Sequence, residues 1–157
     1  MLKSGLILAG VTLVLGTIGA FIFPLICVPC VALLGGIGAG YLAGQFDKPM
    51  AAGAAAQKGA GAGAIGGVGA LLAHLIGGVG NAYLVGPEGA NDILRDLGLD
   101  VGSGAATDPI AYYGGALGSA CCFGMFEVAL MAAVGALGGF LWYQMTGSKA
   151  APPAPAM

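Results

Sequence analysis

The first apolar stretch of the chain runs from Ser4 to Phe46 without a charged side chain. That length is roughly twice the ~20 residues that one membrane-spanning helix needs. Pro24 and Pro29 lie near its middle, and proline interrupts a helix because it fixes φ and lacks an N–H. The pattern therefore predicts two apolar helices joined by a tight turn at the sequence PLICVP.

Two further apolar stretches follow, and they are separated by a polar segment, residues 84–112. Within this segment the sequence NDILRDLG predicts a short helix that Asn91 caps and Gly98 ends. The fold class predicted is all-α, a polytopic bundle of four transmembrane helices over residues 1–147 with a short helix in the outer loop. The Pro/Ala-rich residues 148–157 form a flexible tail. The four predicted spans are residues 5–23, 30–45, 59–83 and 113–143.

The composition fits lipid better than water as the surrounding solvent. Charged residues make up 8% of the chain and hydrophobic residues 58%, whereas about a quarter of the residues in a soluble domain are charged. The net charge is −2 and the sequence has no cluster of lysine or arginine that could hold phosphates, so no nucleic-acid partner is expected. The sequence thus predicts an integral membrane protein.

The charges also predict an orientation. If the four spans alternate, the lysines share one side with a single acid, Asp47, while the other side carries Arg95 and five acids. Lysine and arginine in short flanks mark the cytoplasmic side, so both termini are expected in the cytoplasm and the protein in the cytoplasmic (inner) membrane. The lysines concerned are Lys3, Lys48, Lys58 and Lys149.

Glycine recurs at intervals of four residues along three of the predicted spans. Such small-xxx-small stripes let helix backbones approach closely in lipid, where van der Waals contact drives association. They predict a tight bundle, and association with other membrane chains or with further copies of this chain. The positions expected to pack are Gly36, Gly40, Gly44, Gly59, Gly63, Gly66, Gly67, Gly78, Gly135 and Gly139.

Two ionisable residues, His74 and Glu127, interrupt the third and fourth spans. At a rise of 1.5 Å per residue their depths agree within about one helical turn, and the helices are antiparallel, so direct contact is feasible. A carboxylate at the bilayer centre costs roughly 2.5 to 3.5 kcal/mol, so the pair is a candidate proton or ion path. The alternative is a structural contact that fixes the helix register. The sequence ALLAH is also similar to sites where a histidine binds a haem or chlorophyll metal.

Four cysteines form two pairs, Cys27–Cys30 in the sequence CVPC and the adjacent Cys121 and Cys122. A CxxC pair can exchange electrons through a reactive disulfide. With four spans and both ends inside, the chain resembles the DsbB family of thiol–quinone oxidoreductases, which implies quinone reduction at Cys27 and Cys30. That family's second cysteine pair in the outer loop, and a basic residue near CxxC, are missing from the sequence. A structural disulfide and inert buried thiols are the other interpretations, and a metal held by all four cysteines is not expected.

No P-loop, G-x-S-x-G or H-E-x-x-H motif occurs in the sequence, so no catalytic residue is assigned and the chain is not expected to be an enzyme. No resident cofactor or metal is expected either. The leading hypothesis is a small membrane protein that acts through helix packing, as an accessory or structural subunit of a membrane complex or as a homo-oligomer. Proton or ion translocation through His74 and Glu127, and thiol–quinone chemistry, are the alternatives.

Overall fold

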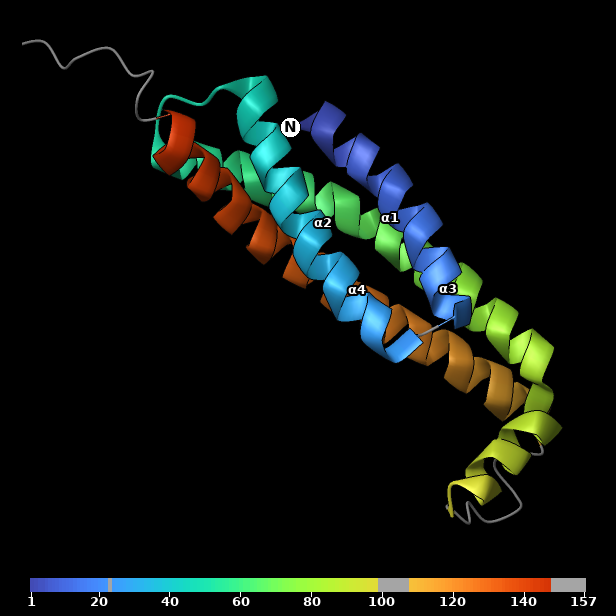
Figure 1. The fold of residues 1–157 in the computed structure, drawn as a ribbon. Coiled ribbons are helices and arrows are strands. Elements are labelled where there is room, and N and C mark those ends of the chain that lie inside the picture. Colours follow the sequence, from blue (N-terminus) through green and yellow to red (C-terminus); the bar gives the residue numbers. More distant parts are fainter. Residues whose placement is uncertain (23, 99–107, 148–157) are drawn as a thin grey trace, which may run out of the picture.

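A computed structural model describes residues 1–22, 24–98 and 108–147, with the side chains of residues 20–29 excepted. Within this part of the chain four α-helices lie side by side in an elongated bundle (Figure 1). The expectation of an all-α helical bundle is confirmed. The elements are α1 (Leu2–Ile22), α2 (Pro24–Asp47), α3 (Ala52–Asp96), α4 (Pro109–Trp142) and a π-helical turn, η1 (Tyr143–Gly147).

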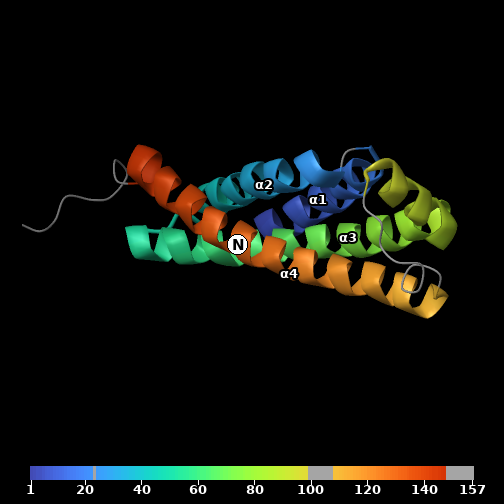
Figure 2. The ribbon, with the colours of Figure 1, turned by 90° about the horizontal axis from the view of Figure 1, so that it is seen from below.

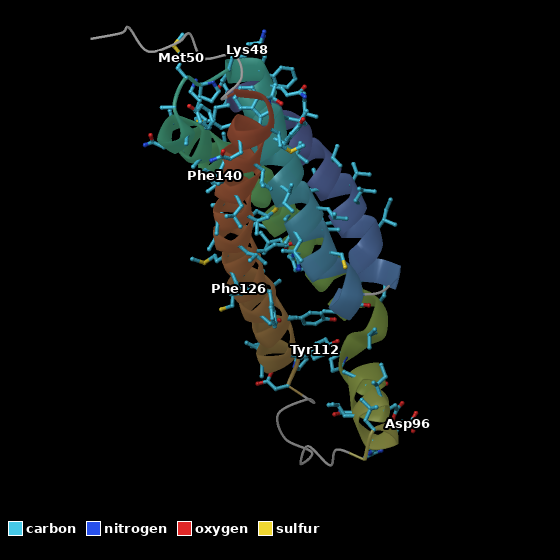
Figure 3. The ribbon with its side chains drawn as sticks, turned by 60° about the vertical axis from the view of Figure 1, so that its left-hand side comes forward. Lys48, Met50, Asp96, Tyr112, Phe126 and Phe140 are labelled. Carbon is cyan, nitrogen blue, oxygen red and sulfur yellow. The ribbon has the colours of Figure 1, made fainter. Side chains whose placement is uncertain are left out.

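The most extensive contact in the bundle is between α3 and α4. Helix α1 packs mainly against α3, and α2 packs mainly against α4. Figure 2 shows α1 and α2 lying together beside α3 and α4. The start of α1, the α2–α3 link and η1 share one end, which we call the lysine end because it carries Lys3, Lys48 and Lys58. Figure 3 shows Lys48 and Met50 at this end and Asp96 at the other. We call the other end the acidic end.

The packing inverts the pattern of a water-soluble core. Buried positions are mostly alanine and glycine, whereas large apolar side chains face outward. A soluble protein buries such side chains, but helices in lipid associate through small residues and turn large apolar ones toward acyl chains. Three of the helices in the described part of the chain, α1, α3 and α4, are long and apolar enough to cross a membrane. The surface therefore suits contact with a lipid bilayer.

The first hairpin differs from its prediction. The expected turn over residues 24–29 and helix start at residue 30 are wrong, because α2 begins at Pro24 and its backbone stays helical through Pro29. Proline is well suited to the first helical position, where its missing N–H is not needed. A second proline further along costs one backbone hydrogen bond, and apolar helix bundles tolerate that loss when neighbouring groups compensate.

Helix α3 is longer than its predicted span, and it contains a kink. Gly86 has φ 68° and ψ 170°, a conformation that favours glycine, and the helix resumes directly at Pro87. The short helix expected to start at Asn91 is thus the last part of α3. Its predicted end is close to correct, since Gly98 has φ 73°. The middle of the outer loop, residues 99–107, and the tail, residues 148–157, lie outside the described residues.

Helix α4 also starts earlier than expected, because its first turn is capped. The Asp108 side chain accepts a hydrogen bond from the Ile110 N–H at 2.9 Å, and proline occupies the first helical position. A tyrosine hydroxyl donates a hydrogen bond to another segment near each end of this helix. Tyr112 donates to the Ala82 carbonyl of α3 at 3.4 Å, and Tyr143 donates to the Met50 carbonyl at 3.3 Å.

An ion cluster at the lysine end joins three helices. The carboxylate of Asp47, the last residue of α2, accepts a hydrogen bond from the Met1 amino group and lies 3.6 Å from Lys58 Nζ of α3. The hydrogen bond from the amino group lowers the pKa of Asp47, although partial burial opposes the shift, and the positive charges of Met1 and Lys58 add to it. Asp47 is therefore ionised at neutral pH and holds the starts of α1 and α3 against the end of α2.

Candidate functional site

Helices α3 and α4 approach so closely near the lysine end that their contact positions have no room for a side chain. A Cβ added to Gly63 would collide with the Met131 carbonyl oxygen, and one added to Gly59 with the Gly135 carbonyl oxygen. In the reverse direction, a Cβ on Gly135 would lie 2.5 Å from the Gly59 oxygen, closer than the 3.0 Å that real Cβ atoms keep. The two backbones are thus in direct contact.

Helix α2 approaches α4 in the same manner. A Cβ on Gly40 would collide with the Gly135 carbonyl oxygen and lie 2.7 Å from the Gly139 nitrogen. One on Gly44 would lie 2.5 Å from Cγ of Trp142, whose indole is almost fully buried. All ten glycines expected to pack lie against a neighbouring helix, but the fit at Gly66 is looser because a Cβ there would meet only the flexible end of Met131, at 3.3 Å, and Leu8.

His74 and Glu127, whose direct contact the sequence made feasible, lie side by side. His74 Nδ1 lies 3.1 Å from Glu127 Oε2 and 3.0 Å from the Ala70 carbonyl oxygen, one turn back along α3. The side chain of Glu127 is 3% exposed, whereas that of His74 is 18% exposed. The carboxylate is therefore enclosed, and the imidazole forms its boundary with the surface of the bundle.

The two contacts of Nδ1 define how this nitrogen is protonated. A carbonyl oxygen accepts hydrogen bonds only, so in a hydrogen bond between His74 and Ala70 the donor is Nδ1. One N–H cannot align well with two acceptors, and Glu127 Oε2 has no hydrogen-bond partner among the described residues. Glu127 Oε2 thus lies beside the imidazole nitrogen without a well-aligned hydrogen bond. Both contacts use Nδ1, and Nε2 lies on the other side of the ring.

Large buried side chains close the core between this pair and the lysine end. Met131, one turn along α4 from Glu127, is fully buried, and its methyl group lies beside Gly35 of α2 and Gly66 of α3. Trp142 is 5% exposed further along the same helix. The sequence alone did not single out Met131, because a methionine in an apolar span has no pattern that distinguishes a core position from a lipid-facing one.

A second interhelical contact, made by Thr12, was not predicted from the sequence. Thr12 of α1 is 1% exposed, and its hydroxyl lies 2.8 Å from the Gly66 carbonyl oxygen of α3 and 2.9 Å from Leu8 O of its own helix. The hydroxyl donates one hydrogen, so it bridges the helices when it donates to Gly66. The available signal was a threonine in a largely apolar span, where a polar side chain needs a partner.

Three of the four cysteines have described side chains. Cys30, Cys121 and Cys122 are free thiols, the first and last of them exposed and Cys121 partly buried. A structural disulfide among these three is therefore not present. The side chain of Cys27 lies outside the described residues, so the predicted CxxC exchange stays a prediction.

The described residues contain no group of three or more His, Cys, Asp or Glu side chains that could hold a metal ion. The haem or chlorophyll ligation predicted for His74 would use a single protein ligand, and it stays a prediction. Comparison with protein-family models, with curated proteins and with solved structures finds no match. Function therefore has to be inferred from the geometry.

Proposed function

We propose that this chain is a rigid membrane scaffold, an accessory or structural subunit that crosses the bilayer four times and associates with other membrane chains or with its own copies. The observation that carries the proposal is the direct backbone contact of α2, α3 and α4 at glycines in the half nearest the lysine end. Helices that touch over several turns in this way form a stiff body, because any relative motion meets carbonyl oxygens rather than flexible side chains.

In this proposal α2 is the fourth crossing. It has 24 residues, enough to span the hydrocarbon core, and its one charged residue is Asp47 at the end. It contacts α4 from Gly36 to Gly44, in parallel. The lysine end then faces the cytoplasm, by the usual excess of positive charge on that side, and the acidic end faces the opposite compartment.

Association would use the part of α4 near the acidic end. A Cβ added to Gly114, Gly115 or Gly118 would meet no described atom within 4 Å, and all three residues are exposed. Glycine on a lipid-facing helix surface contributes little contact with acyl chains, but it permits close approach of another helix. Glycines near the lysine end are thus covered by neighbouring helices, whereas these three glycines near the acidic end are uncovered.

We expect Gly118→Leu to lower the mass of the particle extracted from the membrane while leaving the fold of the chain intact. The leucine would block approach of another helix at Gly118 but would clash with nothing inside the chain. Native mass spectrometry of the extracted protein measures this directly. Gly10→Leu, at an equally open glycine on α1, is the matched control and should leave the mass unchanged. A monomeric mass without either substitution, or equal masses for all three proteins, would contradict the proposed association.

The alternatives have weaker support from the geometry. A proton or ion path through the whole chain would have to pass Met131, Trp142 and the glycine contacts, which fill the core near the lysine end. Thiol–quinone chemistry rests on Cys27 and Cys30 alone. A scaffold role requires neither a pore nor a second cysteine pair. It depends on the glycine contacts between the helices, which are the main feature of the packing.

A further inference from the structure

Glu127 is a buried acidic side chain, and apolar packing around it cannot neutralise a negative charge. Its carboxylate is enclosed by α3 and α4, and Oε2 has no hydrogen-bond partner among the described residues. A carboxylate in an apolar bundle is unfavourable unless a positive charge or a proton neutralises it. Among the described residues, the neighbouring group that can supply either is His74, at 3.1 Å.

The other charges of the described residues are remote from this pair. The charged residues closest to it along each helix are Lys3 on α1, Asp47 on α2, Lys58 and Glu88 on α3, and Asp108 on α4, and they lie toward the two ends of the bundle. The remaining titratable groups between these ends, within the described residues, are thiols and tyrosine hydroxyls: Cys30, Tyr41, Tyr83, Tyr112, Tyr113, Cys121 and Cys122. The protonation of the pair is therefore governed by its own two members.

Counting protons shows what the pair can do. With Nδ1 already carrying a hydrogen, one additional proton on Nε2 gives an imidazolium beside a carboxylate, and the pair is neutral overall. Loss of that proton leaves a net charge of −1 enclosed in the bundle. The ring nitrogen that can exchange the proton is Nε2, because Nδ1 contacts Ala70 and Glu127. The ring also forms the exposed boundary of the pair, while the carboxylate is covered.

We propose that His74 and Glu127 form a binding site for a single proton, which the His74 ring carries while Glu127 supplies the counter-charge. This site is independent of the scaffold role. Met131 lies fully buried between the site and the lysine end, so the site does not conduct across a single chain. Binding of the proton makes the pair neutral, and its release leaves a net charge of −1 enclosed at the α3–α4 contact.

The sequence makes this site unusually simple to observe. His74 is the one histidine of the chain, so ¹⁵N-histidine labelling gives the signal of this ring alone. Glu88 and Glu127 are its two glutamates, so ¹³C-carboxyl-glutamate labelling of the Glu88→Gln variant reports Glu127 alone. Both labels are read by NMR on the full chain in lipid nanodiscs of neutral phospholipid, with pH as the variable. Glu88 is exposed near the acidic end, and Glu88→Gln is therefore also the matched control.

In the Glu88→Gln protein at neutral pH we expect an imidazolium at His74 together with a carboxylate at Glu127. Glu127→Gln should lower the ratio of imidazolium to neutral imidazole about tenfold or more at the same pH, because the counter-charge is gone. His74→Gln in the Glu88→Gln background should convert Glu127 to the neutral acid, since a lone carboxylate is then unpaired.

Three results would overturn the proposal. One is an unchanged imidazolium ratio in Glu127→Gln, with helicity by circular dichroism showing that the variant is folded. Another is a persistent carboxylate in His74→Gln. The third needs no change to either residue and applies even if those variants do not fold: a neutral imidazole in the Glu88→Gln protein at neutral pH, whichever state Glu127 shows.

Discussion

Gly40→Ala is expected to destabilise the bundle by about 1–3 kcal/mol, although it adds a single methyl group. The new Cβ would collide with the Gly135 carbonyl oxygen, and backbone atoms cannot move aside as the end of a flexible side chain can. Helix α2 would have to shift away from α4 and loosen the contacts of Gly36 and Gly44 as well. The loss is measured by unfolding in mixed detergent, followed through helical circular dichroism.

The control for this experiment is Gly38→Ala on the same helix. A Cβ at Gly38 meets no described atom within 4 Å, and alanine is a better helix former than glycine by about 1 kcal/mol. Gly38→Ala should therefore leave stability unchanged or raise it. Equal destabilisation by the two substitutions would show that helix propensity, and not backbone contact, determines the effect.

Met131→Ala should destabilise the protein by about 2–5 kcal/mol, the cost of a comparable truncation in a close-packed core. Met131 is fully buried where α2, α3 and α4 meet, and its loss leaves a void beside Gly35 and Gly66. In lipid the cost comes from lost van der Waals contact, because acyl chains solvate methionine as well as the core does. The same detergent unfolding experiment gives the value.

Met125→Ala is the matched comparison, because Met125 lies on the same helix with 67% of its surface exposed. It should change stability by less than about 0.5 kcal/mol. If the truncation at Met125 cost as much as the truncation at Met131, the bundle would not have the core described above, and the closure of the His74–Glu127 site toward the lysine end would lose its basis.

The sequence predicted well those features that depend on regular helical spacing. Glycines four residues apart share a helix face, so the contacts of Gly40, Gly59 and Gly63 followed from their intervals alone. The similar depth of His74 and Glu127 followed from the constant rise per residue in two antiparallel spans, which made their contact feasible. Both inferences need only helix geometry and a lipid surrounding, and neither depends on details of side-chain packing.

Features that depend on local backbone alternatives or on distant partners were not predictable. Proline marks a helix start as readily as a break, so the sequence could not decide between a turn before Cys30 and a helix that begins at Pro24. The Asp47 cluster joins groups 46 residues apart through the Met1 amino group. Met131 is central only because three helices converge on it.

The two halves of the bundle differ in how their glycines are packed. The half near the lysine end is held by backbone contact and has no room for change, as the collisions at Gly40 and Gly63 show. The half near the acidic end has uncovered glycines on α4, a kink in α3 at Gly86 and the ionisable pair between them and the core. Association is therefore assigned to the half with the uncovered glycines, supported by the rigid one.

The central claim is that four helices, α2 included, cross the membrane as one bundle with the lysine end in the cytoplasm. Single cysteines in a cysteine-free background test it most directly: Lys3→Cys, Met50→Cys and Asp96→Cys, all at exposed positions. A membrane-impermeant thiol reagent applied to intact spheroplasts should label Asp96→Cys alone, and the other two only after permeabilisation. Labelling of Lys3→Cys and Met50→Cys from opposite sides, or of all three from one side, would contradict the account.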